Sequence, residues 1–198
     1  MKTFRLPKGP WHRAHKSRLS HPSARSYSLT QRFWLWLVRQ KSNSERDLNV
    51  FSALVKLGPI FPRYLLFLSH ILPKGQIARA DKERIILRVA YRMGCIYEWG
   101  HHSHFADQLG ISAADVCALA EPVFVSGDER LSAFVAGVDE LIDERAVGDE
   151  TWSRLAAVLT EAQLVEFCML VGHYIMIAGF INSVGVTLEP GYLEGIGE

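Results

Sequence analysis

Apolar residues recur at intervals of three and four through almost all of residues 45–198, which is the spacing of one face of an α-helix. Capping boxes mark three helix starts, at Ser44, Ser112 and Thr160. The predicted helices span residues 44–58, 61–72, 78–94, 97–110, 112–122, 128–147, 148–160 and 160–186. No run alternates between apolar and polar positions as a strand would, so the pattern predicts an all-α domain.

The segment 160–186 is apolar enough to be compared with a membrane helix. Glu166, His173 and Asn182 interrupt it, and its capping box is typical of a soluble helix. We therefore predict a central helix that is buried on most sides, and no membrane span. The run FWLWLV at residues 33–38 is too short to cross a bilayer and predicts a short apolar helix that docks on the domain or on a membrane surface.

The helix predicted over residues 78–94 places one acid among its apolar side chains. Arg84, Arg88 and Arg92 follow one another at four-residue steps and form a polar stripe. Glu83 lies on the opposite side, among the apolar residues. An acid in the first turn is also favoured by the helix dipole, so Glu83 is either a functional acid that faces inward or an ordinary N-terminal acid.

The next helix carries a second acid and an imidazole on one face. Glu98 and His102 are four residues apart, about 40° from each other around the helix, on its apolar side, whereas His101 and His104 point elsewhere. A buried carboxylate beside an imidazole can tune proton transfer near neutral pH, or can simply fix packing as an ion pair. Cys95 precedes this helix, where the dipole favours a thiolate, although a buried Cys is also a small apolar residue.

Charge separates the N-terminus from the rest of the 198 residues. Residues 1–44 contain ten Lys or Arg and no acid, so the other twelve basic residues face all 21 acids, a net charge of −9. We predict a basic, disordered extension over residues 1–44 and one helical domain over residues 45–198. The Arg- and Ser-rich composition also fits an organelle transit peptide, an alternative to a cytoplasmic location. No nucleic-acid-binding fold accompanies the charge, so we expect no nucleic-acid partner.

The cysteines and histidines do not form a recognisable metal or disulfide pattern. Cys95, Cys117 and Cys168 are widely spaced, without a C-x-x-C pair, which favours a reducing compartment. Glu98 and His102 supply only two ligands, and Glu83 would have to supply a third. We therefore expect neither a metal nor another cofactor.

The spacing of these four residues resembles that of the carboxymuconolactone decarboxylase family, which includes alkyl hydroperoxidase D. The family's peroxidase branch has Glu, eleven residues, Cys, two, Cys, three and His, and this chain has Glu83, Cys95, Glu98 and His102 at the same intervals. Glu98 replaces the second Cys, and the YEW sequence before the His resembles the decarboxylase-like branch. The resemblance covers about residues 45–190. It implies an alkyl hydroperoxidase D-like helical bundle that assembles into trimers or hexamers.

Three functions are consistent with the resemblance. The first is a cofactor-independent decarboxylase of a small carboxymuconolactone-like acid, with Glu83, Cys95, Glu98 and His102 as candidate catalytic residues. In this hypothesis His102 is the proton donor or the partner of the oxyanion, and Glu98 orients His102 and sets its proton affinity. Glu83 is a second acid and Cys95 lines the pocket. The second is a peroxidase that uses Cys95 alone, since Glu98 cannot resolve a sulfenic acid. The third is a non-catalytic helical oligomer that binds a small ligand.

Overall fold

The computed structural model describes residues 4–12, 17–19, 27–42 and 46–194, and these residues confirm the predicted all-α class. Their only β-type pairing is an isolated bridge between Phe4 and Leu193. The elements, in chain order, are α1 (Leu29–Ser42), α2 (Asn49–Leu54), the 3-10 helix η1 (Val55–Ile60), α3 (Phe61–Ile71), α4 (Arg79–Arg92), α5 (Ile96–Gln108), α6 (Ala113–Ala118), α7 (Glu129–Asp143), α8 (Asp149–Ala156) and α9 (Glu161–Val184).

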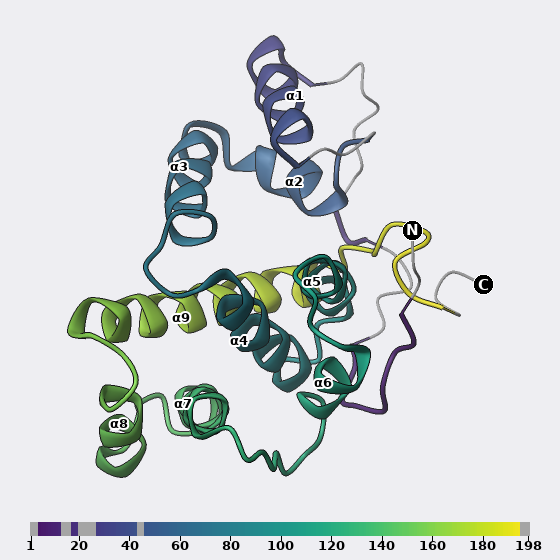
Figure 1. Cartoon of the computed structure of the whole chain (residues 1–198). Helices are drawn as coiled ribbons and strands as arrows, with labels where there is room; N and C mark the ends of the chain where they lie inside the picture. The colour runs from purple at the N-terminus through teal and green to yellow at the C-terminus, as the bar shows by residue number, and fades with distance from the viewer. Residues whose placement is uncertain (1–3, 13–16, 20–26, 43–45, 195–198) are drawn as a thin grey trace.

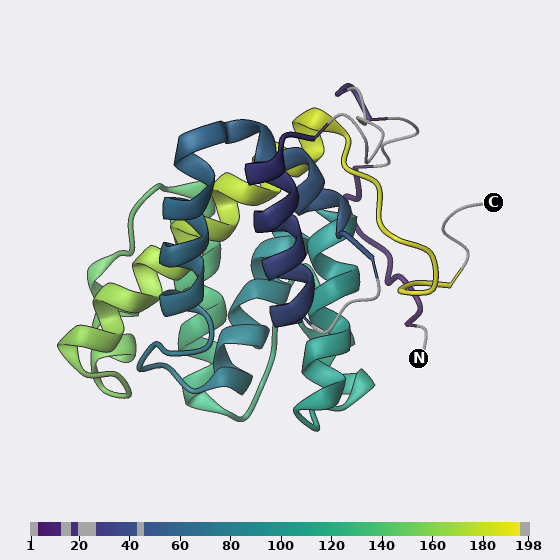
Figure 2. The same cartoon turned by 90° about the horizontal axis from the view of Figure 1, so that it is seen from above.

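The helix α4 lies in the middle of the bundle and packs against α5, α7 and α9 (Figure 1). Figure 1 also shows the long α9 crossing behind α4, with α1 to α3 on the opposite side from α7 and α8. In Figure 2 the bundle is seen from above, with α1 and α3 nearest the viewer. Ile86 of α4 and Leu170 and Ala178 of α9 are completely buried at this crossing. The core therefore fixes α4 and α5 from several sides, which positions the polar side chains that these two helices carry.

The caps predicted from sequence are present where the structure describes them. Ser112 accepts a hydrogen bond from the backbone of Asp115, and Thr160 forms a full capping box with Gln163. Ser44 lies outside the described residues. These side chains satisfy backbone N–H groups that the first helical turn leaves without partners, so they fix where α6 and α9 begin.

Two helical stretches, Asn49–Ile71 and Glu161–Val184, have the length and apolar composition of a membrane helix. The first is broken at Gly58, whose φ of 58° interrupts the helix just before Pro59. The second stretch is α9. Half of its most apolar 18-residue stretch is buried inside the bundle. Its apolar character is thus explained in large part by core packing, as expected for a central helix.

Parts of the basic segment contact the bundle. Phe4 is buried, and the indole of Trp11 packs against the rings of Tyr91 and Trp99. The apolar run 33–38 lies within α1, which buries Leu35. The division between an extension over residues 1–44 and a domain over residues 45–198 stays a prediction. Trp11, which belongs to the predicted extension, contacts Tyr91 and Trp99 of the predicted domain.

The prediction that Arg88 belongs to a polar stripe of α4 is wrong. This side chain is fully buried, and its guanidinium donates to both carboxylate oxygens of Asp139 on α7, at 2.8 and 2.6 Å. Arg92 binds the same carboxylate at 2.7 Å. A helical wheel places a residue by its angle alone, and cannot show that a neighbouring helix supplies an acid that makes burial of the guanidinium possible.

Candidate functional site

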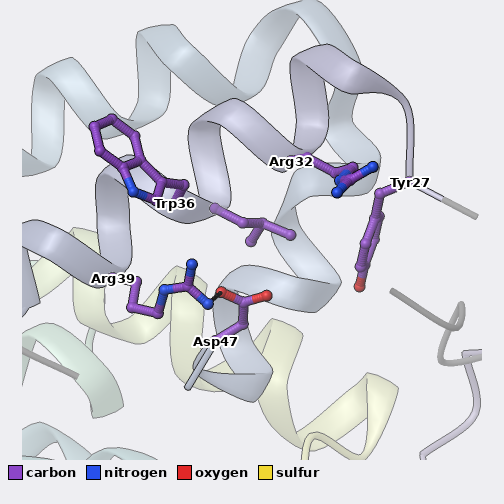
Figure 3. Close-up of a pocket in the computed structure, with 6 residues that line it drawn as sticks. Tyr27, Arg32, Trp36, Arg39 and Asp47 are labelled. Atoms are coloured by element: carbon purple, nitrogen blue, oxygen red, sulfur yellow. Dashed lines mark ion pairs between the residues drawn. The ribbon is translucent and has the colours of Figure 1, made fainter. Parts of the chain in front are cut away.

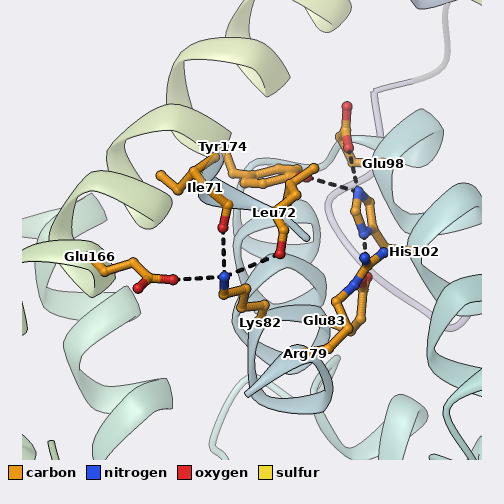
Figure 4. A network of polar contacts seen from close by, with 9 residues as sticks. All are labelled: Ile71, Leu72, Arg79, Lys82, Glu83, Glu98, His102, Glu166 and Tyr174. Carbon is orange, nitrogen blue, oxygen red and sulfur yellow. Dashed lines mark hydrogen bonds and ion pairs between the residues drawn. The ribbon is translucent and has the colours of Figure 1, made fainter. Parts of the chain in front are cut away.

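His102 lies between two carboxylates (Figure 4). Its Nδ1 is 2.5 Å from Oε2 of Glu83, and its Nε2 is 3.2 Å from Oε2 of Glu98. All three side chains are buried. Each ring nitrogen therefore faces an acceptor, an arrangement that favours an imidazolium with both N–H groups donating.

The turn between α4 and α5 brings the three groups together. Glu98 and His102 share a face of α5 because they are four residues apart, as the sequence predicted. Gly94 reverses the chain with a φ of 61°, in the left-handed region that favours glycine. Glu83, one turn into α4, then faces His102 from the adjacent helix. The intervals between the four motif residues therefore suit this helix–turn–helix geometry, which brings Glu83 of α4 to Glu98 and His102 of α5.

Arg79 and Tyr174 complete the contacts of this cluster, and sequence reasoning missed both. Arg79 donates from Nε to Oε1 of Glu83 at 2.7 Å, and the hydroxyl of Tyr174 lies 3.2 Å from Nε2 of His102. Arg79 could have been found as the residue four positions before Glu83. Tyr174 lies in the apolar helix α9, and no signal in the sequence separates it from the core residues around it.

A tyrosine and a histidine extend the polar cluster toward α3. The hydroxyl of Tyr64 on α3 lies 3.5 Å from Nε2 of His173 on α9, and the His173 ring packs edge-on against that of Tyr174. Burial lowers the pKa of His173, and burial together with the charge of Glu98 raises the pKa of Tyr64. The phenol is thus protonated at neutral pH and can serve as a hydrogen-bond donor beside Glu98.

The charges of the cluster determine its protonation state. Burial lowers the pKa of His102, but the carboxylates of Glu83 and Glu98 outweigh this effect and raise it to about 9. Burial alone would raise the pKa of Glu83, but His102 and Arg79 outweigh burial and the net shift is downward. At neutral pH the site therefore holds a protonated imidazole and an ionised Glu83.

The thiol of Cys95 is completely buried at the N-cap of α5. The helix position predicted a stabilised thiolate, but burial and the nearby charge of Glu98 raise its pKa above the usual range. The dipole effect is outweighed because a thiolate here would have lost its water and would lie near a carboxylate. Of the other two cysteines, Cys117 is exposed and Cys168 is partly buried.

Lys82, the neighbour of Glu83, belongs to a separate polar network that fixes the loop before α4 (Figure 4). Its buried ammonium donates to the carbonyls of Ile71 and Leu72, at 2.6 and 3.1 Å, and lies 2.7 Å from Oε1 of Glu166. Glu166 also accepts a hydrogen bond from the backbone of Gln76. This network joins the end of α3 to α9 and holds the first turn of α4, from which Arg79 and Glu83 project.

His101 and His104 lie outside the His102 cluster, as the helical wheel predicted, but both are buried. Nε2 of His101 is 2.7 Å from Glu189, whose other oxygen accepts from the hydroxyl of Tyr97 at 2.9 Å. The ring of Tyr192 packs against both imidazoles. The sequence did not indicate this second cluster, which attaches the C-terminal segment to α5.

The structure thus brings Glu83, Glu98 and His102 into direct contact and places Cys95 near Glu98. Their catalytic role stays a prediction. Among the residues that the structure describes, no group of three His, Cys, Asp or Glu side chains has an arrangement that could hold a metal ion.

Residues 60–140 match the Carboxymuconolactone decarboxylase family, so the resemblance predicted from the motif is confirmed over that region. The matched segment contains α4 and α5 and therefore all four candidate residues. A comparison with curated proteins found no match.

Solved structures share the fold. One is an alkylhydroperoxidase AhpD core, an uncharacterized peroxidase-related protein from Ralstonia eutropha JMP134, with a TM-score of 0.73, 15% identity and coverage of 89% of this chain and 94% of that one. Another is an uncharacterized peroxidase-related protein from Silicibacter sp. TM1040, with a TM-score of 0.78, 13% identity and coverage of 93% and 97%. The predicted alkyl hydroperoxidase D-like helical bundle is confirmed.

Proposed function

Starting from the family match over residues 60–140, we propose that this protein is a cofactor-independent decarboxylase of a small carboxymuconolactone-like organic acid. The observation that carries the proposal is the buried imidazole of His102, held protonated between the carboxylates of Glu83 and Glu98. A decarboxylase needs a proton donor of this kind because loss of carbon dioxide leaves a carbanion that must be protonated.

The proposed reaction has two steps. The bond between the carboxylate carbon and the neighbouring carbon breaks, carbon dioxide leaves, and the electron pair moves into an adjacent carbonyl as an enolate. Nε2 of His102 then donates its proton to the carbon, which restores the carbonyl. Glu83 keeps the imidazole oriented through Nδ1, and the hydroxyl of Tyr174, 3.2 Å from Nε2, is a donor for the enolate oxygen.

Release of carbon dioxide from a panel of carboxylated lactones tests the proposal. We expect His102→Ala to lose about 100- to 10,000-fold in rate, the usual contribution of a general acid. Cys95→Ser should retain most of the activity because no thiol step is involved. His12→Ala is the matched control, since His12 is an exposed histidine outside α3 and α9. An active His102→Ala beside an inactive Cys95→Ser would overturn the proposal.

The alternative is a peroxidase that uses Cys95 alone, with an external thiol as resolving reductant. It is supported by the structural relatives, both of which are described as peroxidase-related proteins. Complete burial and a raised pKa of the Cys95 thiol oppose it, since the thiolate is the nucleophile. Stopped-flow oxidation of the protein by peroxide separates the two functions, because only the alternative requires Cys95→Ser to abolish consumption of peroxide.

We also propose that the chain forms a homo-oligomer through α3 and α9. Leu66 of α3 and Val165, Met169 and Met176 of α9 are each more than half exposed. The two helices are adjacent, because the ring of Phe67 contacts that of His173. Large exposed apolar side chains that gather on one face are typical of subunit interfaces.

Light scattering coupled to gel filtration tests this assembly. Met169→Glu should reduce the measured mass to that of the monomer of 22.3 kDa, because it places a charge in the interface. The control is Val125→Glu, which changes an exposed apolar residue in the loop between α6 and α7. A monomeric wild-type protein would refute the proposal.

A further inference from the structure

A partly open pocket lies between α1 and the residues just before α2, and it shares no residue with the His102 cluster. Its volume is about 190 Å³, and Figure 3 shows the side chains around it. The side chains that line it are two arginines, two aromatic residues, a leucine and an acid, namely Tyr27, Arg32, Leu35, Trp36, Arg39 and Asp47.

One face of α1 builds most of the cavity. Arg32, Trp36 and Arg39 follow one another at four- and three-residue steps, so they project from the same side of the helix. Leu35, between them, is buried and attaches α1 to the core. Trp36 is about half exposed, with 47% of its surface accessible. Figure 3 shows its indole at the opposite end of the pocket from Arg32 and Tyr27.

The described lining of the pocket carries two guanidinium groups and one carboxylate. Arg39 is 3.7 Å from Oδ1 of Asp47, so these two charges balance each other (Figure 3). Within the described part of the chain, the guanidinium of Arg32 has no ion-pair partner. An unpaired guanidinium beside aromatic rings recognises a carboxylate through two parallel hydrogen bonds.

We propose that this cavity binds a single-ring aromatic carboxylate. Arg32 would hold the carboxylate, and the ring of Tyr27, which lies beside Arg32 in Figure 3, would contact the aromatic ring. The size agrees, because a cavity of roughly 150 Å³ holds benzene, and a volume of about 190 Å³ accommodates one ring with its carboxylate. The site is independent of the proposed decarboxylase chemistry, since it contains none of the residues that carry that chemistry.

Titration of the full chain with 4-fluorobenzoate, followed by fluorine NMR, tests the proposal. We expect saturable binding that weakens at least about tenfold in Arg32→Gln, equivalent to about 1.4 kcal/mol. Tyr27→Leu should weaken it as well, because it removes the aromatic ring beside Arg32. Lys56→Gln is the matched control, since Lys56 is an exposed cation on η1 outside the cavity. Circular dichroism confirms that each variant is folded.

Three further measurements decide whether the ligand is recognised as proposed. Cyclohexanecarboxylate and inorganic phosphate should compete at least about tenfold less well than benzoate, because neither has a planar ring. His102→Ala should bind 4-fluorobenzoate as the wild type does. Absence of saturable binding, equal affinity in Arg32→Gln, effective competition by phosphate, or loss of binding in His102→Ala would each overturn the assignment.

Discussion

Removing the charge of Glu98 should lower the pKa of His102. In the wild type this pKa is raised to about 9, against the effect of burial, by two carboxylates. Glu98→Gln keeps the shape of the side chain but removes the charge that lies 3.2 Å from Nε2. An opposite charge within about 4–6 Å shifts a pKa by about one to three units, so the pKa of His102 should fall by that amount.

NMR titration of ring-labelled histidine measures this change, with His102→Asn used to assign the signal. In the decarboxylase assay the basic limb of the pH profile should move to lower pH in the same variant, because protonated His102 is the active form. Glu189→Gln is the control, since it removes the carboxylate that holds His101 and not His102. A His102 signal that still titrates near pH 9 in Glu98→Gln would refute the electrostatic reasoning.

The same pKa has a consequence for stability. The pKa of His102 is raised from 6.5 to about 9, and one unit corresponds to 1.36 kcal/mol, so protonation of this group stabilises the fold by about 3 kcal/mol. Because the shift is upward, this stabilisation is fully present below pH 6.5 and is lost as the pH rises through about 9. Urea unfolding at pH 6.5 and 9.5 measures it, and His102→Asn should lose the difference.

Three other predictions concern the neighbouring residues. Gly75→Ala should destabilise the protein by about 1–3 kcal/mol in urea unfolding, since the added Cβ would overlap the carboxylate of Glu166 and the ammonium of Lys82; unchanged stability would show that this loop is free to move. Lys82→Met should cost about 3–5 kcal/mol, because it leaves Glu166 without its buried partner, and a neutral result would contradict the role given to this ion pair. In the native protein a thiol reagent should label the exposed Cys117 and spare the buried Cys95 until unfolding; rapid labelling of Cys95 would favour the peroxidase.

Some features of the site were predictable because they depend on spacing within one helix. The four-residue interval between Glu98 and His102 puts both on one face of α5 whatever the helix packs against. The helical pattern also placed Glu83 among the apolar residues of its helix, and the resemblance then linked Glu83 and Cys95 to this pair through the fixed intervals of the motif. Helix caps such as that at Thr160 were equally local, since the side chain and the backbone group that it satisfies lie in the same turn.

Other features depend on groups that are distant in the sequence. Tyr174 reaches His102 across 72 positions, and Glu189 reaches His101 across 88. Composition suggested a basic arm separate from the domain, yet Trp11 packs against Trp99. Which partner a side chain meets is decided by how whole helices pack, and apolar burial that drives this packing has no preferred direction.

The sequence by itself therefore determined the helical class, several helix boundaries and the pairing of Glu98 with His102. Only the tertiary structure decided that Glu83 takes the other ring nitrogen of this histidine and that the thiol of Cys95 is buried. The physical reason is that periodicity gives the direction of a side chain relative to its own helix axis. The charge, the solvent and the hydrogen-bond partners that set its chemistry come from the neighbouring helices.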